Sequence, residues 1–181
     1  ELQKERGYSA GFSASLGRTF RTELATQREA TDEAIRAHLA DRAVLSDIAP
    51  DQVAAVEAGV ADLERRRKQI DTLSLKVPDL AAYYTGIIQS LLAASNRVRL
   101  GAGGDPEATL MEAAELIALA KENAGLERAM GATGLGAGRF ADTVHRRFTD
   151  LGAQQRAFLT RAGAVLGRPD FVAGLTEAPA A

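Results

Sequence analysis

The chain has 181 residues and a formal net charge of −2, and it contains no cysteine. This nearly neutral charge gives no reason to expect nucleic acid or an anionic membrane as a partner, and the lack of thiols excludes disulfides and thiolate metal sites. Aromatic residues make up only 5% of the sequence. Alanine, leucine, glutamate and arginine are abundant, so the composition favours an all-helical protein.

The first 46 residues contain no proline and are predicted to form one helical segment. A continuous helix of this length would extend about 65–70 Å. Three glycines weaken its beginning: Gly7, Gly11 and Gly17. The sequence SDIAPDQ, at 46–52, predicts a break, after which Pro50 suits the first position of a new helix.

The second predicted helix runs from Pro50 to about Leu75. Its apolar residues recur at the spacing of a bundle seam: Val53, Val56, Val60, Leu63 and Ile70. The sequence KVPDL, at 76–80, predicts the next break. The helix that follows, from Asp79 to about Leu100, is apolar around much of its circumference, so we expect it to be central.

The sequence GAGGDP, at 101–106, combines small residues, an aspartate suited to an N-cap and a proline, and it predicts a turn. A fourth long helix is predicted from 106 to about 131, where the sequence GATGLGAG interrupts it. A fifth helix is predicted from about 139 to 166, and Pro169 separates a short last segment.

Together these elements predict an all-α fold, an elongated up-and-down bundle of long antiparallel helices of the four-helix-bundle type with extra helices. We expect one domain over 1–168 and a short terminal segment and tail over 169–181. Long helices with heptad seams also pair between subunits, so a homodimer is expected. No stretch approaches the ~20 apolar residues that span a bilayer. Because the chain opens on Glu1 rather than methionine, we expect it to be a piece of a longer protein.

Arg6 is in phase with the predicted core of the first helix. At 100° per residue, one stripe contains the following residues: Leu2, Arg6, Ser9, Ser13, Leu16 and Phe20. The three apolar members of this stripe are expected in the core. Arg6 either pairs with a neighbouring glutamate, extends out of the helix end or faces the interior. The two serines either donate to a ligand or bond back to their own helix.

A second arginine repeats this pattern in KENAGLERAMGATG, at 121–134. Arg128 follows Ile117 by eleven residues, close to three helical turns, so both side chains point the same way. The residues around Arg128 on this face are small: Ala120, Ala124, Gly131 and Ala132. The sequence thus predicts two arginines at core phase, each beside residues with little or no side chain.

A guanidinium in a protein core requires a partner, because an unpaired buried charge costs several kcal/mol. Glu5 and Glu127 are the partners that the chain itself offers. The alternative is a small anion from solution, because the paired N–H groups of a guanidinium match a planar oxyanion. Glu5 and Glu127 would then balance the excess positive charge from outside the anion's contact shell.

Other features favour simpler interpretations. Lys121 is expected to be solvated, and Tyr83 and Tyr84 to pack between helices. The basic run ERRRKQ, at 64–69, places Arg67 on the heptad seam and predicts a solvated face or interhelical salt bridges. The two histidines have no carboxylate cluster at ligand spacing, so no metal and no cofactor are expected. No nucleophile has a recognisable base, so no catalytic residue and no enzyme activity are expected.

Three stretches, in this order and spacing, resemble the nitrate- and nitrite-sensing (NIT) domain family. They are LQKERGYSAGF near the start, YYTGIIQSLL at 83–92, and KENAGLERAMGATG with the following GRF. The resemblance implies an all-helical bundle that binds nitrate or nitrite between helices and passes helix displacement to an output module. Members of the family are sensor modules of chemoreceptors, histidine kinases, other receptors and a transcription antiterminator.

Carried onto this chain, the family's two anion-binding arginines are Arg6 and Arg128. The residues expected in the pocket wall or just behind it are Glu5, Gly7, Ser9, Ala124, Gly125 and Glu127. We expect an extracytoplasmic (periplasmic) sensor domain of a membrane receptor in preference to a cytoplasmic one. Two rivals remain: a ligand-free structural or dimerisation bundle, and a sensor of another small anion such as a carboxylate.

Overall fold

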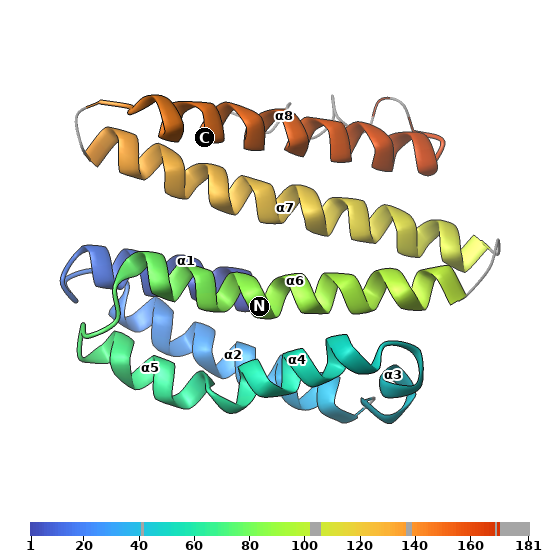
Figure 1. Ribbon diagram of the computed structural model, residues 1–181, viewed down its shortest axis with the longest axis horizontal. Helices are drawn as coiled ribbons and strands as arrows, with labels where there is room; N and C mark the ends of the chain where they lie inside the picture. The colour runs from blue at the N-terminus through green and yellow to red at the C-terminus, as the bar shows by residue number, and fades with distance from the viewer. Residues whose placement is uncertain (41, 102–105, 137–138, 169, 171–181) are drawn as a thin grey trace. The chain divides into compact units, whose positions relative to one another are not determined.

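A computed structural model describes residues 1–40, 42–101, 106–136, 139–168 and 170 (Figure 1). These residues form eight α-helices, and none of them lies in a strand. The all-α prediction is therefore confirmed. In this part of the chain, no helix is both long and apolar enough to cross a membrane. The contacts divide the chain into two compact units, Glu1–Val98 and Arg99–Ala181, which are described separately below.

Unit 1 contains most of the helices. They are α1 (Leu2–Ala14), α2 (Arg21–Ala40), α3 (Arg42–Ile48), α4 (Pro50–Ala61), α5 (Leu63–Asp71) and most of α6 (Val77–Gly101). Only Asp62 separates α4 from α5. Pro50 stands in the first turn of α4, as predicted, where its missing N–H costs no helical hydrogen bond.

The prediction of one helical segment over residues 1–46 is wrong, because α1 ends at Ala14. The N–H of Gly17 donates to the carbonyl of Phe12 at 2.8 Å, and that of Leu16 donates to the carbonyl of Ser13 at 3.1 Å. Leu16 has a φ of 55° and Gly17 a φ of 76°. This pair of hydrogen bonds around a left-handed residue is a Schellman motif, which satisfies the last carbonyls of a helix and turns the chain.

Because α1 ends early, two residues of the predicted stripe are exposed rather than buried. Leu16 and Phe20 were expected in the core, but their side chains are 69% and 42% exposed. Both lie beyond the helix, so the 100° phase no longer applies to them. The Phe20 ring instead folds back over Gly11, where a Cβ would come within 2.6 Å of it.

The core of unit 1 forms around α6 and the seam of α4 and α5. Leu80, Tyr84, Ile87 and Ile88 of α6 are buried, which confirms its central position. The predicted seam is confirmed as well, because Val53, Val56, Leu63 and Ile70 are buried and Val60 is half-buried. At Gly59 the backbone of α4 approaches α6 so closely that a Cβ would lie 2.5 Å from Cγ1 of Ile87.

Unit 2 is a hairpin of α7 (Pro106–Gly136) and α8 (Asp142–Val165), which lie side by side (Figure 1). Buried residues on the two helices are Ala113, Leu116, Ala120, Leu151 and Ala162. The interruption predicted at 131–138 begins later than expected, because α7 continues to Gly136 before α8 begins at Asp142. Most of the predicted turn at 101–106 and nearly all of the predicted tail lie outside the described residues. The domain boundary at 168 stays a prediction.

Candidate functional site

Arg6 lies in the interior of unit 1, as its helical phase predicts. Its exposed fraction is 7%, and Leu2, Ser9 and Ser13 on the same stripe of α1 are also buried. The Arg6 Nη1 atom donates to the Thr85 hydroxyl on α6 at 2.7 Å. The guanidinium is therefore directed toward α6 rather than out of the helix end.

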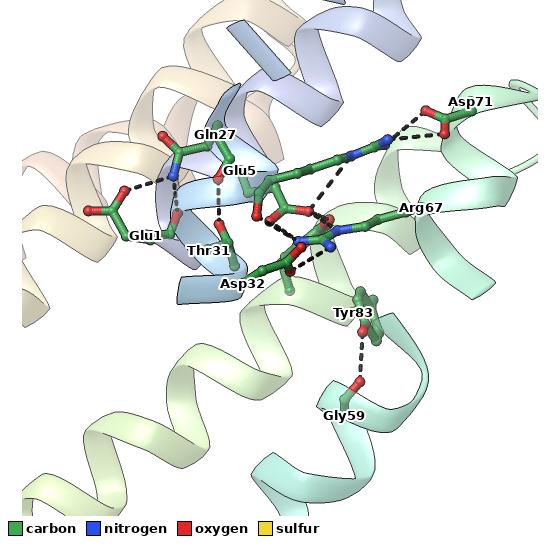
Figure 2. A network of polar contacts seen from close by, with 11 residues as sticks. Glu1, Glu5, Gln27, Thr31, Asp32, Gly59, Arg67, Asp71 and Tyr83 are labelled. Carbon is green, nitrogen blue, oxygen red and sulfur yellow. Dashed lines mark hydrogen bonds and ion pairs between the residues drawn. The ribbon is translucent and has the colours of Figure 1, made fainter. Parts of the chain in front are cut away.

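Glu5, the residue before it, is fully buried and belongs to a different set of contacts (Figure 2). Its carboxylate accepts two hydrogen bonds from Arg67 on α5, from Nε at 2.8 Å and from Nη2 at 2.9 Å. It also accepts the hydroxyl of Tyr84 on α6 at 2.8 Å. One carboxylate thus joins α1, α5 and α6.

Arg67 extends this network to α2. Its Nη1 atom donates to Asp32 at 2.7 Å, and its Nη2 atom donates to the carbonyl of Arg28 at 3.4 Å. Burial disfavours the charged form, but the hydrogen bonds and charges of Glu5 and Asp32 raise the pKa of Arg67 above its ordinary value. Arg28 in turn pairs with Asp71 at 2.9 Å and lies 4.0 Å from Glu5. The network therefore holds α1, α2, α5 and α6 together through charge-assisted hydrogen bonds.

These contacts revise the role expected of Glu5. From the sequence, Glu5 was expected to pair with Arg6 or to balance charge near the anion without touching it. In the structure its carboxylate accepts hydrogen bonds from Arg67 and Tyr84. Sequence reasoning missed this pair, although the position of Arg67 on the heptad seam was a usable signal. An interhelical salt bridge is confirmed for Arg67. Its neighbours Arg65 and Arg66 both pair with Asp62.

The two tyrosines of α6 use their hydroxyls between helices. Tyr83 donates to the carbonyl of Gly59 at 2.7 Å, and Tyr84 donates to Glu5. Burial, followed by the negative charge of Glu5, raises the pKa of Tyr84 above its usual value. Neither hydroxyl is directed at Arg6, which donates to the next residue of α6, Thr85. Sequence reasoning missed Thr85, a polar residue in a largely apolar helix.

Among the other α1 residues expected in the site, Ser9 is buried and Gly7 is exposed. The Ser9 hydroxyl lies beside that of Tyr84 without a hydrogen-bonding geometry, and within the described residues neither it nor the Ser13 hydroxyl has a hydrogen-bond partner. A Cβ at Gly7 would meet nothing within 4 Å. The buried stripe of α1 therefore presents a guanidinium and two hydroxyls.

The remaining predicted residues lie on α7, in unit 2. Ala124, Gly125 and Glu127 are half-buried. Arg128 is exposed, and so is Ile117 on the same face, so the core position predicted for Arg128 is wrong. The Glu127 carboxylate rests on α8, because a Cβ at Gly152 would come within 2.7 Å of its Oε1 atom. Arg6 and Arg128 thus belong to different units, and their convergence on one ligand stays a prediction. Lys121 is exposed, as expected.

Comparisons with known proteins show which family and which solved structure this chain is similar to. A family model described as nitrate and nitrite sensing matches residues 1–177. Among solved structures, the chain is similar to the NasR transcription antiterminator, with a TM-score of 0.86 and 25% sequence identity. That match covers 99% of this chain and 50% of the other, so the chain spans half the length of this relative. A search of the curated proteins gives no match.

Proposed function

The chain belongs to the nitrate- and nitrite-sensing family, and we propose that it is the ligand-binding sensor domain of a bacterial signal-transduction protein. Its ligand is a small oxyanion, nitrate or nitrite, bound by Arg6 and Arg128. The observation that carries the proposal is the buried Arg6 guanidinium, which is 7% exposed within a family motif. A buried positive charge favours an anion strongly, because little water competes for it.

The surroundings of Arg6 support this assignment. The adjacent carboxylate, Glu5, is engaged by Arg67 and Tyr84. The Arg67 pair also fixes the rotation of α1, since a buried two-pronged ion pair tolerates little displacement. Arg6 is therefore presented from a helix whose orientation is set independently of any ligand. A planar oxyanion matches the paired N–H groups of such a guanidinium.

Signalling follows from the linkage between binding and conformation. An anion that binds two arginines from different helices favours the arrangement in which both reach it, and it shifts the population toward that arrangement. Helix rearrangement of this kind is the proposed signal. Glu127, Ala124, Gly125, Gly7 and Ser9 remain the proposed surroundings of the anion.

The sensor is proposed to work as a part of a larger assembly. NasR is a transcription antiterminator, and only 50% of its chain is covered by the match. We therefore place an output module elsewhere in the full-length protein, and a homodimer as the signalling unit. An extracytoplasmic position in a membrane receptor is the proposed location.

A ligand-free structural bundle is the second candidate, and one observation favours it. Arg67 is a buried arginine whose charge is met entirely by the chain's own carboxylates, Glu5 and Asp32. A buried arginine in this unit is thus no proof of a ligand. A sensor of a carboxylate is the third candidate, because carboxylates offer the same planar pair of oxygens.

Thermal unfolding in a panel of sodium salts at equal ionic strength separates these candidates. Ligand at about one hundred times its dissociation constant stabilises the folded chain by about 2.7 kcal/mol. We expect nitrate and nitrite to raise the unfolding midpoint, with chloride as the reference salt. A rise with formate or acetate in place of nitrate would identify a carboxylate sensor, and no rise with any salt would support the structural bundle.

A further inference from the structure

The hydroxyl of Thr85 differs from several other hydroxyls within the described helices. Hydroxyls there commonly donate to a carbonyl one turn back. Three that do so are Thr31 to Gln27 at 3.0 Å, Ser90 to Gly86 at 3.1 Å and Thr149 to His145 at 3.1 Å. Thr85 lies inside α6, but its oxygen accepts the Arg6 Nη1 hydrogen at 2.7 Å instead.

This contact leaves the hydrogen of the Thr85 hydroxyl available. A threonine hydroxyl has one hydrogen to donate and two lone pairs that accept. Within the described part of the chain, Thr85 accepts from Arg6 and donates to no acceptor. A cationic donor on the oxygen polarises the O–H bond and strengthens the hydrogen bond that the hydroxyl itself can donate. The group that such a hydroxyl prefers is therefore a negatively charged acceptor next to Arg6.

The neighbouring residues hold this hydroxyl in place. Glu5 and Arg6 are consecutive on α1, and Tyr84 and Thr85 are consecutive on α6. The two helices are joined by two adjacent hydrogen bonds, Tyr84 to Glu5 at 2.8 Å and Arg6 to Thr85 at 2.7 Å. Because Glu5 is also held by Arg67, the Arg6–Thr85 pair is positioned before any ligand arrives.

We propose that Thr85 is a further residue of the anion site. Its oxygen holds the Arg6 guanidinium, and its hydroxyl hydrogen is donated to an oxygen of the anion that Arg6 binds. This inference rests on the proposed function. It adds a neutral donor from α6 to the arginines of α1 and α7, and so includes the central helix of unit 1 in ligand recognition.

Calorimetric titration of the full chain with sodium nitrate, against a constant sodium chloride background, tests the proposal. Thr85→Val keeps the shape and removes the hydroxyl, and we expect it to bind nitrate about ten- to a hundredfold more weakly, because a hydrogen bond to a charged group is lost. Thr85→Ser retains the hydroxyl and should bind within about threefold of the parent. Thr31→Val is the matched control, because the Thr31 hydroxyl is used within its own helix, and its affinity should equal that of the parent.

The outcomes separate this inference from the function on which it rests. If the parent binds nitrate and Thr85→Val binds it equally well, the role of Thr85 is overturned and the sensor function stands. A loss in both Thr85→Val and Thr85→Ser would also overturn it, because the effect would then not follow the hydroxyl. If the parent binds no nitrate, the proposed function itself fails. Unfolding midpoints without nitrate check that each variant folds, and Thr85→Ala replaces Thr85→Val if the latter does not.

Discussion

At the residue scale, the Glu5 carboxylate is a tightly constrained charge of unit 1. It is fully buried, and three N–H or O–H groups from two other helices surround it. Removing a carboxylate from water costs several kcal/mol, and only such a set of partners offsets that cost. The same constraint fixes the direction of Arg6, the next residue along α1.

Glu5→Gln should destabilise the protein by about 3 kcal/mol, because it removes the buried one of the two carboxylate charges that neutralise the Arg67 guanidinium. Urea unfolding followed by circular dichroism measures this change. The matched control is Glu64→Gln. It alters an exposed ion pair between Glu64 and Lys68 within α5 and should leave the midpoint unchanged. Equal midpoints for the two variants would contradict the role assigned to Glu5.

The raised pKa of Tyr84 predicts that the free energy of unfolding falls at alkaline pH. Burial and the Glu5 charge raise its pKa in the folded protein above the ordinary value of 10.0. Above pH 10 the unfolded chain therefore loses this proton while the folded chain keeps it, and the free energy of unfolding falls by up to about 1.4 kcal/mol per pH unit. Urea midpoints between pH 8 and 11 should fall less steeply for Tyr84→Phe than for the parent, and parallel curves would contradict the assignment.

Helical phase was sufficient to predict that Arg6 faces the interior and that Arg67 lies on a seam. It was insufficient to predict that Arg67 pairs with Glu5, since these residues are 62 positions apart and meet only through the packing of α1 on α5. Thr85 was missed for the same reason, because its partner is 79 positions away. The side that a residue faces is a local property, whereas its partner depends on which helices pack together.

At the element scale, three helices end in the same way. In α1, α5 and α8 a residue with positive φ follows the cap, namely Leu16 at 55°, Leu73 at 56° and Gly167 at 64°. In each case the next N–H donates to a carbonyl five residues back. Glycine accepts this conformation readily, whereas leucine adopts it at a cost of about 1 kcal/mol. Two helices of unit 1 therefore carry strain at their C-terminal ends.

Leu16→Gly should stabilise the protein by about 0.5–1 kcal/mol, because it relieves the strained φ and removes a side chain that is 69% exposed. Thermal and urea unfolding measure the gain. Leu110→Gly, at a 63% exposed position inside α7, should instead destabilise the protein by about 1 kcal/mol. If both variants destabilise it equally, the turn after α1 is described wrongly.

Local sequence signals predicted the positions of several helices correctly, whereas they missed where two helices end. The seam of α4 and α5, the proline at the start of α4 and the central position of α6 follow from spacing and local preferences. The end of α1 was missed because the left-handed position holds Leu16, with Gly17 one residue later than expected for a C-terminal cap. The continuation of α7 beyond 131 was missed because glycines weaken a helix without breaking it.

At the scale of the whole molecule, the proposed anion site takes one arginine from each compact unit. Arg6 belongs to the first and Arg128 to the second. Motifs in both units suggested the nitrate- and nitrite-sensing family, and the match over residues 1–177 confirms it. The meeting of two arginines on one anion could not be derived in the same way, because it depends on packing between distant segments and on a ligand that no sequence period encodes.

Calorimetric titration of nitrate into the parent chain, Arg6→Ala and Arg128→Ala tests this claim most directly. Arg147→Ala, which removes an exposed arginine of α8, is the control for net charge. In the proposed site each arginine would supply charge-assisted hydrogen bonds, so we predict that either substitution weakens binding by at least about a hundredfold while the control binds like the parent. Nitrate binding of unchanged affinity in either Arg6→Ala or Arg128→Ala would contradict the two-arginine site.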